Sequence, residues 1–200
     1  RIGMKINNNV VFQFKITLHE IAPPIWRRIQ VPVKYSFWDL HVAIQDSMGW
    51  LDYHLHAFRF RPKHKKTSIE IGIPLDDWGG EEVIPGWEVP IVEYFTDIGQ
   101  IIQYAYDFGD GWSHEILFEG ILLKAKGAKY PKCTDGERAC PPEECERVDG
   151  YYNVIEILKD PKHPEYKGYV EWLKGHAKNY WPYEPDNFTP SKVCFENPKA

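Results

Sequence analysis

The dipeptide Asp110-Gly111 constrains the fold of this chain more than any other feature of its sequence. It stands between two runs of alternating apolar and polar residues, within residues 104–119, which read YAYDFGDGWSHEILFE. Both central residues of a type I′ turn need a positive φ, which Asp tolerates and Gly adopts freely. The pattern therefore predicts a β-hairpin that reverses through a two-residue turn at Asp110-Gly111.

The register of this predicted hairpin places an acid beside an imidazole. With a two-residue turn, Asp107 faces His114, and directly opposed residues have Cβ atoms roughly 4.5–5.5 Å apart. A carboxylate that orients an imidazole is the smallest unit of general acid–base catalysis, because histidine titrates near neutral pH. One hypothesis is therefore that Asp107 and His114 form the catalytic pair of an enzyme. In the structural alternative, Asp107 stabilises the turn.

The remaining elements predict an α+β fold with a mixed, mainly antiparallel sheet. We expect strands over residues 10–20, 25–31, 55–61 and 67–74. Residues 35–50 predict one long helix packed on the sheet, with Ser36 as its N-cap and Gly49 after its last turn. Two shorter helices, over residues 150–158 and 164–175, predict a C-terminal helical portion.

Length and composition favour a single domain over residues 1–200. Folding a chain of 200 residues buries roughly 70% of the surface of the unfolded chain, so a substantial core is available. Sixteen Pro and fifteen Gly imply many turns and favour a strand-rich fold over a helical bundle. Residues 124–149 predict an irregular, cysteine-containing segment between the sheet and the C-terminal helices. Residues 75–90 predict a long loop or lid.

Arg27 stands among apolar residues of the strand predicted over residues 25–31. A buried guanidinium needs a partner for its charge, whereas a long basic side chain at a sheet margin extends to water. We therefore expect either an ion pair with a carboxylate or a side chain that reaches the edge of the sheet.

Histidines and acids of the central segment form a first candidate site. The group comprises His41, His54, His56, Asp107, Asp110 and His114. His54 and His56 lie two apart on one predicted strand, and with His114 they offer the three imidazoles that a zinc ion accepts. The spacing alone is not a known metal signature. The alternative is that these histidines cap a sheet edge and no cofactor is bound.

Cysteines form a second candidate zinc site, made of Cys133, Cys140 and Cys145. Zinc sites usually contain tight Cys-x₂₋₄-Cys pairs, and here only Cys140 and Cys145, with four residues between them, approach that spacing. Cys194, His163 or His176 would complete a tetrahedron if the tail folds back. The alternative is that all four cysteines are free thiols.

Charge and missing motifs limit the function classes. The net charge is −5, the pI is about 5.9, and only seven arginines are present. Such a chain lacks the overall electrostatic footprint of a duplex-DNA binder. The basic run of residues 61–66 is the exception, and a short charged run on a loop is usually a solvated surface. The sequence contains no Gly-x-Gly-x-x-Gly or Walker A motif and no Gly-x-Ser-x-Gly elbow, which excludes these nucleotide and hydrolase classes.

Six motifs follow one another along the chain: Pro-Pro-Ile-Trp-Arg-Arg at residues 23–28, Leu-His-Val-Ala-Ile-Gln at 40–45, Met-Gly-Trp at 48–50, His-Leu-His-Ala-Phe at 54–58, Tyr-Asp-Phe-Gly-Asp-Gly-Trp-Ser-His at 106–114, and Cys-Pro-Pro-Glu-Glu-Cys at 140–145. With these motifs the chain resembles the plasmid pRiA4b ORF-3-like family over residues 11–188. Many members continue Pro-Pro-Glu-Asp with a Gly-Gly pair, whereas here Glu146-Arg147 follow Cys145. The resemblance implies an α+β domain and brings no established catalytic residues.

The resemblance also implies a link to mobile elements, because members occur in bacteria, archaea and mobile elements. Some are labelled transposon resolvases. A recombinase needs a Ser or Tyr nucleophile among several arginines that stabilise a pentavalent phosphate, together with a basic surface. Seven scattered arginines on an acidic chain do not match that requirement.

Two functions remain from different classes. The first is a non-enzymatic binding or accessory protein with a protein or nucleic-acid partner. The alternative is a small metal-dependent or acid–base hydrolase that uses Asp107, His114, His54 and His56. No stretch approaches eighteen apolar residues and no leader precedes the first strand, so we expect a cytoplasmic protein without a membrane partner.

Overall fold

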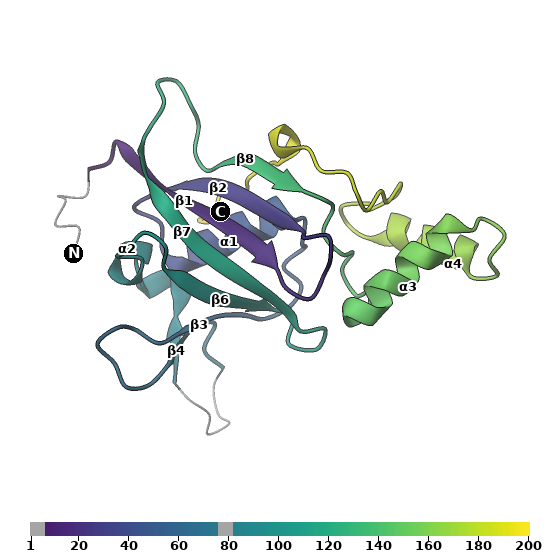
Figure 1. Ribbon diagram of the computed structural model, residues 1–200, viewed down its shortest axis with the longest axis horizontal. Coiled ribbons are helices and arrows are strands. Elements are labelled where there is room, and N and C mark those ends of the chain that lie inside the picture. Colours follow the sequence, from purple (N-terminus) through teal and green to yellow (C-terminus); the bar gives the residue numbers. More distant parts are fainter. Residues whose placement is uncertain (1–6, 76–81) are drawn as a thin grey trace.

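The fold is built on one mixed sheet, seen in a computed structural model that describes residues 7–75 and 82–200. Within these residues eight strands are ordered β5-β4-β3-β6-β7-β1-β2-β8 (Figure 1). Neighbouring strands are antiparallel except for β4 and β5, which are parallel. The predicted α+β class with a mainly antiparallel sheet is confirmed. The strands are β1 Val10–Leu18, β2 Trp26–Pro32, β3 His56–Phe60, β4 Ile69–Gly72, β5 Val83–Pro85, β6 Ile101–Tyr106, β7 Trp112–Leu123 and β8 Lys132–Glu137.

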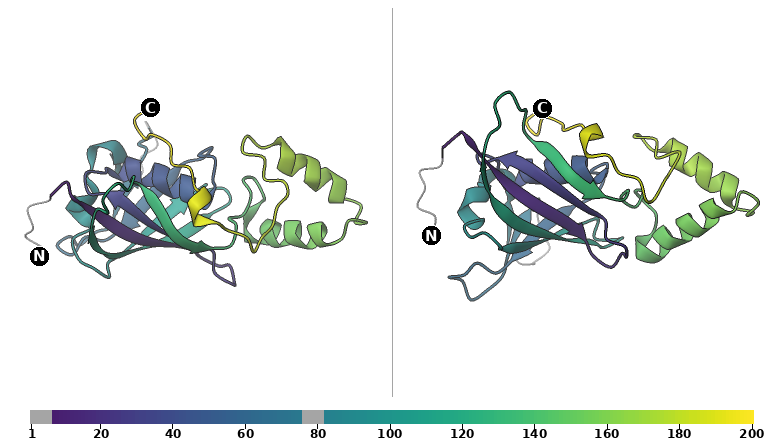
Figure 2. Two further views of the ribbon diagram at one scale, coloured as in Figure 1. Left: turned by 90° about the horizontal axis from the view of Figure 1, so that it is seen from above. Right: turned by 45° about the horizontal axis from the view of Figure 1, so that its top comes forward.

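Helices cover one face of the sheet and extend beyond one end of it. Helix α1 packs on the face that carries the buried side chains, and α3 and α4 lie together beside the sheet (Figures 1 and 2). Among the described residues, no helix has the length and apolar content needed to cross a lipid bilayer. The helices are α1 Phe37–Met48, α2 Ile91–Tyr94, α3 Arg147–Lys159 and α4 Tyr166–Gly175, with 3-10 turns η1 Gly86–Glu88 and η2 Pro190–Lys192.

The bounds of helix α1 are set by its capping residues, and its buried face is set by the spacing of its apolar residues. Ser36 accepts a hydrogen bond from the Asp39 backbone N–H, and the Asp39 side chain accepts one from the Ser36 N–H, which is a capping box. Gly49 ends the helix with a left-handed φ of 102°. The face that includes Leu40 and Ile44 is fully buried against the sheet. Burying each such side chain contributes about 1.5–3 kcal/mol.

Three sequence expectations about these elements differ from the structure. Helix α1 has 12 residues and α3 has 13, so the description of one long helix is not confirmed. Residues 124–149 are not irregular throughout, because they contain β8, which pairs with β2. Strand β8 reads KCTDGE and buries only Cys133, so it carries no apolar alternation that would predict a strand. The loop expected over residues 75–90 contains β5 and η1, and its residues 76–81 lie outside the described part.

The C-terminal portion is joined to the sheet by a shared core. Buried side chains of α3 and α4, among them Tyr151, Val154 and Leu173, belong to the same apolar cluster as the inner face of the sheet. After α4 the chain runs back along β8 and α1, so that its end lies near the start of α1 (Figure 2). This returning segment contacts β8 through η2.

Arg27 lies on the inner face of β2 and is 1% exposed. Its Nε donates to the Ser47 carbonyl oxygen at 2.6 Å and its Nη1 to the carbonyl oxygens of Trp26 at 2.8 Å and Glu137 at 3.0 Å. Its Nη2 donates to the Met48 carbonyl oxygen at 3.4 Å. Neither expectation for this residue is correct, because Arg27 is deeply buried and its partners are neutral carbonyls rather than a carboxylate.

Candidate functional site

The central hairpin turns through five residues, 107–111, and not through two. Tyr104 pairs with His114 and Tyr106 with Trp112, so the predicted pairing of Asp107 with His114 is wrong. The reversal starts earlier because Asp107 itself takes a left-handed φ of 55°. Its carbonyl oxygen accepts the Gly111 N–H at 2.6 Å. The hairpin reverses at the position that the sequence predicts. Because its turn is three residues longer than predicted, each residue of β7 pairs with a residue of β6 three positions earlier in the chain than predicted.

The Asp107 carboxylate holds this turn together. Its Oδ1 accepts the backbone N–H groups of Gly109 at 3.1 Å and Asp110 at 3.2 Å. An Asp side chain that binds backbone N–H groups two and three residues ahead is a common way to close a turn. Asp107, a candidate catalytic residue, therefore stabilises the turn of the hairpin.

Three of the predicted site histidines, His41, His56 and His114, are enclosed in the core, and two of them have lowered pKa values. His114 Nδ1 donates to the Tyr104 carbonyl oxygen at 3.2 Å, and burial lowers the pKa of His114 to about 4. His56 stacks on His41, and burial lowers its pKa to about 2, with a further effect from His41. No hydrogen bond or ion pair joins either ring to Asp107 in the described chain. Both rings are therefore uncharged at neutral pH and remote from solvent.

His54 is the imidazole that lies beside Asp107. Its Nε2 is 3.5 Å from Asp107 Oδ2 and 2.7 Å from Glu144 Oε1. Partial burial lowers the pKa of His54, but the hydrogen bond to Glu144 and the charge of Asp107 outweigh it, so the net pKa is raised. The acid–imidazole contact thus exists with a different histidine, and Glu144 is its closer acid.

A buried glutamate joins this contact to the core. Glu143 is fully buried, and its Oε1 accepts the Leu51 N–H at 2.6 Å and the Tyr106 hydroxyl at 2.8 Å. Its Oε2 has no partner among the described side chains, and burial raises the pKa of Glu143. Tyr106 packs on Trp50 with ring centroids 5.5 Å apart. Three of the sequence motifs therefore meet at one junction.

The loop before α3 is fastened to the hairpin tip. The Glu146 N–H donates to Asp110 Oδ2 at 3.2 Å, and Arg147 Nε donates to the Gly109 carbonyl oxygen at 3.2 Å. Gly150, in the first turn of α3, packs so closely on this loop that a Cβ would overlap the Cys145 carbonyl oxygen. The hairpin tip thereby holds the loop residues at which α3 begins.

A groove of about 380 Å³ lies between this loop, α3 and the start of α4. We call it the acidic groove, and its charged and aromatic lining consists of Glu144, Glu146, Glu165, Tyr169 and Trp172. The rings of Tyr169 and Trp172 are edge to face, 5.8 Å apart and 80° inclined. Its described lining contains no Lys, Arg or His. Sequence reasoning missed these residues, although the acids on both sides of Cys145 were a possible signal.

The cysteines of the second candidate site form no disulfide. Cys133, Cys140 and Cys145 are buried and Cys194 is exposed. Burial raises the pKa of each buried thiol, for Cys140 to about 12. Within residues 7–75 and 82–200, no three or more His, Cys, Asp or Glu side chains are arranged to hold a metal ion. Zinc at either predicted set stays a prediction, and either set would have to rearrange to bind it.

Comparisons with known proteins find similarity over most of the chain. The family model of the plasmid pRiA4b ORF-3-like protein matches residues 10–192. The uncharacterized protein y4hQ of Sinorhizobium fredii (strain NBRC 101917 / NGR234) is 34% identical over 163 residues, 81% of this chain and 80% of that protein. The crystal structure of a protein of unknown function, MM3350 from Methanosarcina mazei Go1, superposes with a TM-score of 0.80 at 38% identity. That match covers 94% of this chain and all of the solved chain. The chain belongs to the plasmid pRiA4b ORF-3-like family.

Proposed function

We propose that this protein is a non-enzymatic binding protein that takes a basic segment of a partner protein into the acidic groove. One observation carries this proposal: three glutamates and two aromatic rings line a groove whose described lining holds no cation. A Lys or Arg side chain is attracted to carboxylates and to the faces of Trp and Tyr rings. The groove therefore offers both contacts that a basic side chain uses.

Two of the three carboxylates are free to receive such a side chain. Glu146 and Glu165 are exposed, and no ion pair engages either of them in the described chain. Glu144 already contacts His54, so its charge is partly balanced. Because the acids lie on the rim of an open groove, they favour rapid, salt-sensitive association more than very tight binding. This is the behaviour expected of an accessory protein.

A protein partner is better supported than a nucleic acid. On the sheet face that α1 leaves open, Arg28 pairs with Glu119 at 2.8 Å and Arg59 pairs with Glu70 at 2.9 Å. Binding to phosphates requires basic side chains that are free to neutralise them, and the net charge of −5 opposes it. The family's plasmid origin suggests proteins of mobile elements as a source of the basic segment.

The hydrolase alternative retains one favourable observation, the contact of His54 with Asp107 and Glu144. An imidazole with a raised pKa between two acids suits proton transfer. His114 and His56, which the alternative also needs, are enclosed in the core. We therefore place the binding function first.

Chemical-shift mapping tests the proposal. A blocked tripeptide with a central lysine is titrated into labelled protein, and its norleucine counterpart serves as the uncharged control. We expect saturable shifts at the indole N–H of Trp172 with the lysine peptide alone. Gly168 lines the groove, and an added Cβ there meets nothing within 4 Å, so Gly168→Leu should fill the groove and abolish the shifts. Equal shifts with norleucine, or shifts that survive Gly168→Leu, would contradict the proposal.

A further inference from the structure

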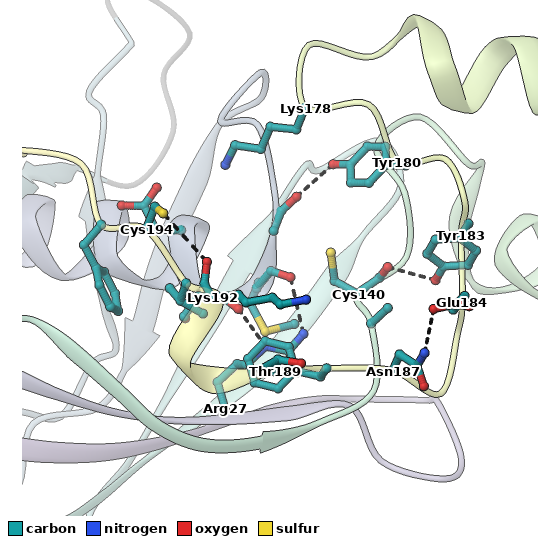
Figure 3. Close-up of a pocket in the computed structure, with 18 of the residues that line it drawn as sticks. Arg27, Cys140, Lys178, Tyr180, Tyr183, Glu184, Asn187, Thr189, Lys192 and Cys194 are labelled. Carbon is teal, nitrogen blue, oxygen red and sulfur yellow. Dashed lines mark hydrogen bonds between the residues drawn. The ribbon is translucent and has the colours of Figure 1, made fainter.

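A second cavity, of about 580 Å³, lies between the C-terminal end of α1 and the returning segment of residues 178–196 (Figure 3). The segment is held over it by two hydroxyl groups. Tyr180 donates to the Gly49 carbonyl oxygen at 2.8 Å, and Tyr183 donates to the Cys140 carbonyl oxygen at 2.9 Å. The volume falls within the roughly 300–1,000 Å³ of small-molecule sites. The cavity is therefore a built part of the fold, independent of the acidic groove.

The deep wall of this cavity carries an uncompensated positive charge. Arg27 lines it, and the hydrogen bonds of its guanidinium run to four neutral carbonyl oxygens, with no carboxylate paired to it among the described residues. A guanidinium has five N–H donors, so one Nη2 hydrogen remains without a partner. A buried charge without a counter-charge is unfavourable, and an anion beside it removes part of that cost.

Two lysines add to this charge. Lys192 lines the cavity, and Figure 3 shows its side chain extending across the cavity beside Cys140. None of the described acids forms an ion pair with Lys192. Lys178 lines the opposite side, where its Nζ donates to the Trp50 carbonyl oxygen at 3.1 Å. A ligand anion would therefore meet positive groups from two sides.

Three carboxylates also line the cavity, and they lie nearer to solvent than Arg27. Asp46 is partly buried and accepts the Glu196 N–H at 2.8 Å. Glu184 is exposed and accepts from Asn187 Nδ2 at 2.6 Å. Glu196 is exposed as well. The cavity is thus positive at depth and acidic at its rim, so a ligand's negative group belongs at the deep end.

Apolar side chains complete the walls and define the body of the ligand. Phe188, Val193 and Phe195 line the cavity with Met48. The Phe188 ring lies 3.5 Å from the Arg27 guanidinium carbon, so this aromatic surface adjoins the charge directly. An occupant that satisfies both features has an apolar body and one anionic group. A fully hydrated inorganic anion would leave the apolar walls without a contact.

We propose that this cavity binds a small organic acid, with its carboxylate between Arg27 and Lys192 and its apolar body against Phe188. Three compounds with the same ring test this: benzoate, benzyl alcohol and benzylammonium. Cys194 lines the cavity and is the exposed cysteine, whereas Cys133, Cys140 and Cys145 are buried, so a trifluoromethyl group attached by alkylation reports from inside it. We expect a saturable ¹⁹F shift with benzoate and none with the other two.

Variants that remove one positive charge show whether benzoate is bound through its carboxylate or only through its apolar ring. Lys192→Met keeps the length of the side chain, and it should weaken benzoate about fivefold, the size of a partly exposed charge pair. Lys174→Met, on α4 and outside the cavity lining, should leave the affinity unchanged. Because the label itself occupies space, calorimetric titration of unlabelled protein with the same compounds repeats the test. Absence of saturable benzoate binding in both measurements, equal response to all three compounds, or no effect of Lys192→Met would overturn the proposal.

Discussion

The imidazole rings of His41 and His56 lie parallel in the core, with their centroids 3.4 Å apart and their planes inclined by 8°. His41 is held by the Tyr104 hydroxyl at 2.7 Å and by Asp52 Oδ1 at 2.8 Å. Neither ring nitrogen of His56 has a partner among the described residues. A positive charge on His56 would be buried without a hydrogen-bond partner, so the pair is stable only while His56 is neutral.

This pair predicts a loss of stability in acid. Burial lowers the pKa of His56 to about 2, so protons bind the unfolded chain, where histidine titrates near 6.5, before they bind the folded protein. The stabilisation is complete above pH 6.5 and is lost as the pH falls below it, by about 1.4 kcal/mol per pH unit for each such histidine. Urea unfolding between pH 7.5 and pH 5 measures the slope. His56→Phe should reduce it, whereas the same change at the exposed His64 should not.

His54 should show the opposite shift. Its net pKa is raised by Glu144 and Asp107, so its stabilising contribution is present below pH 6.5 and is lost as the pH rises through the folded pKa. NMR titration of the ring protons should give a pKa above the ordinary value of about 6.5. In Glu144→Gln the hydrogen-bonded charge is gone, and the pKa should fall. A pKa that stays unchanged in this variant would mean that the contact does not form in solution.

Replacing Asp107 should lower the stability of the folded protein. Asp107→Ala removes an acceptor of two backbone N–H groups and places an ill-suited residue at a left-handed φ, so unfolding free energy should fall by about 1–3 kcal/mol. Asp107→Asn keeps an acceptor and tolerates that φ, and it should cost less. Chemical denaturation distinguishes the two. Equal losses would show that the charge, and not the hydrogen bonds, is what stabilises the turn.

Two helical glycines predict opposite results for the same substitution. Gly150→Ala should destabilise the protein by about 3 kcal/mol or more, because the methyl group collides with the Cys145 carbonyl oxygen. At Gly168 an added Cβ meets nothing within 4 Å, so Gly168→Ala should stabilise α4 by up to about 1 kcal/mol. Thermal unfolding of the two variants checks both. A neutral Gly150→Ala would contradict the fastening of the loop to α3.

Apolar alternation and helix-capping residues predict most of the helices and strands. Polar strands and contacts between residues far apart in the sequence cannot be predicted from such local patterns. The alternation in β1 and the caps at Ser36 and Gly49 act within a few residues, so the sequence shows them directly. Strand β8 is polar and exists because β2 offers an open edge, which no local pattern reveals.

In the candidate site, too, local features could be predicted from the sequence and long-range contacts could not. The turn at Asp110-Gly111 was evident, but its length depends on Asp107 taking a left-handed conformation, and this shifted His114 opposite Tyr104. The acidic groove arises where the loop before α3 meets α4. Glu146 and Glu165, 19 positions apart, therefore gave no sign of sharing a groove.

A double-mutant cycle between Glu165→Gln and the replacement of lysine by norleucine in the peptide tests the central claim most directly. Four dissociation constants give the coupling between the groove carboxylate and the peptide charge. The expected coupling is about 1 kcal/mol, falling as salt is added. The cycle with Glu171→Gln, on α4 but outside the groove lining, should give none. A coupling of zero at Glu165, or an equal one at Glu171, would contradict the acidic groove as the site where a basic partner binds.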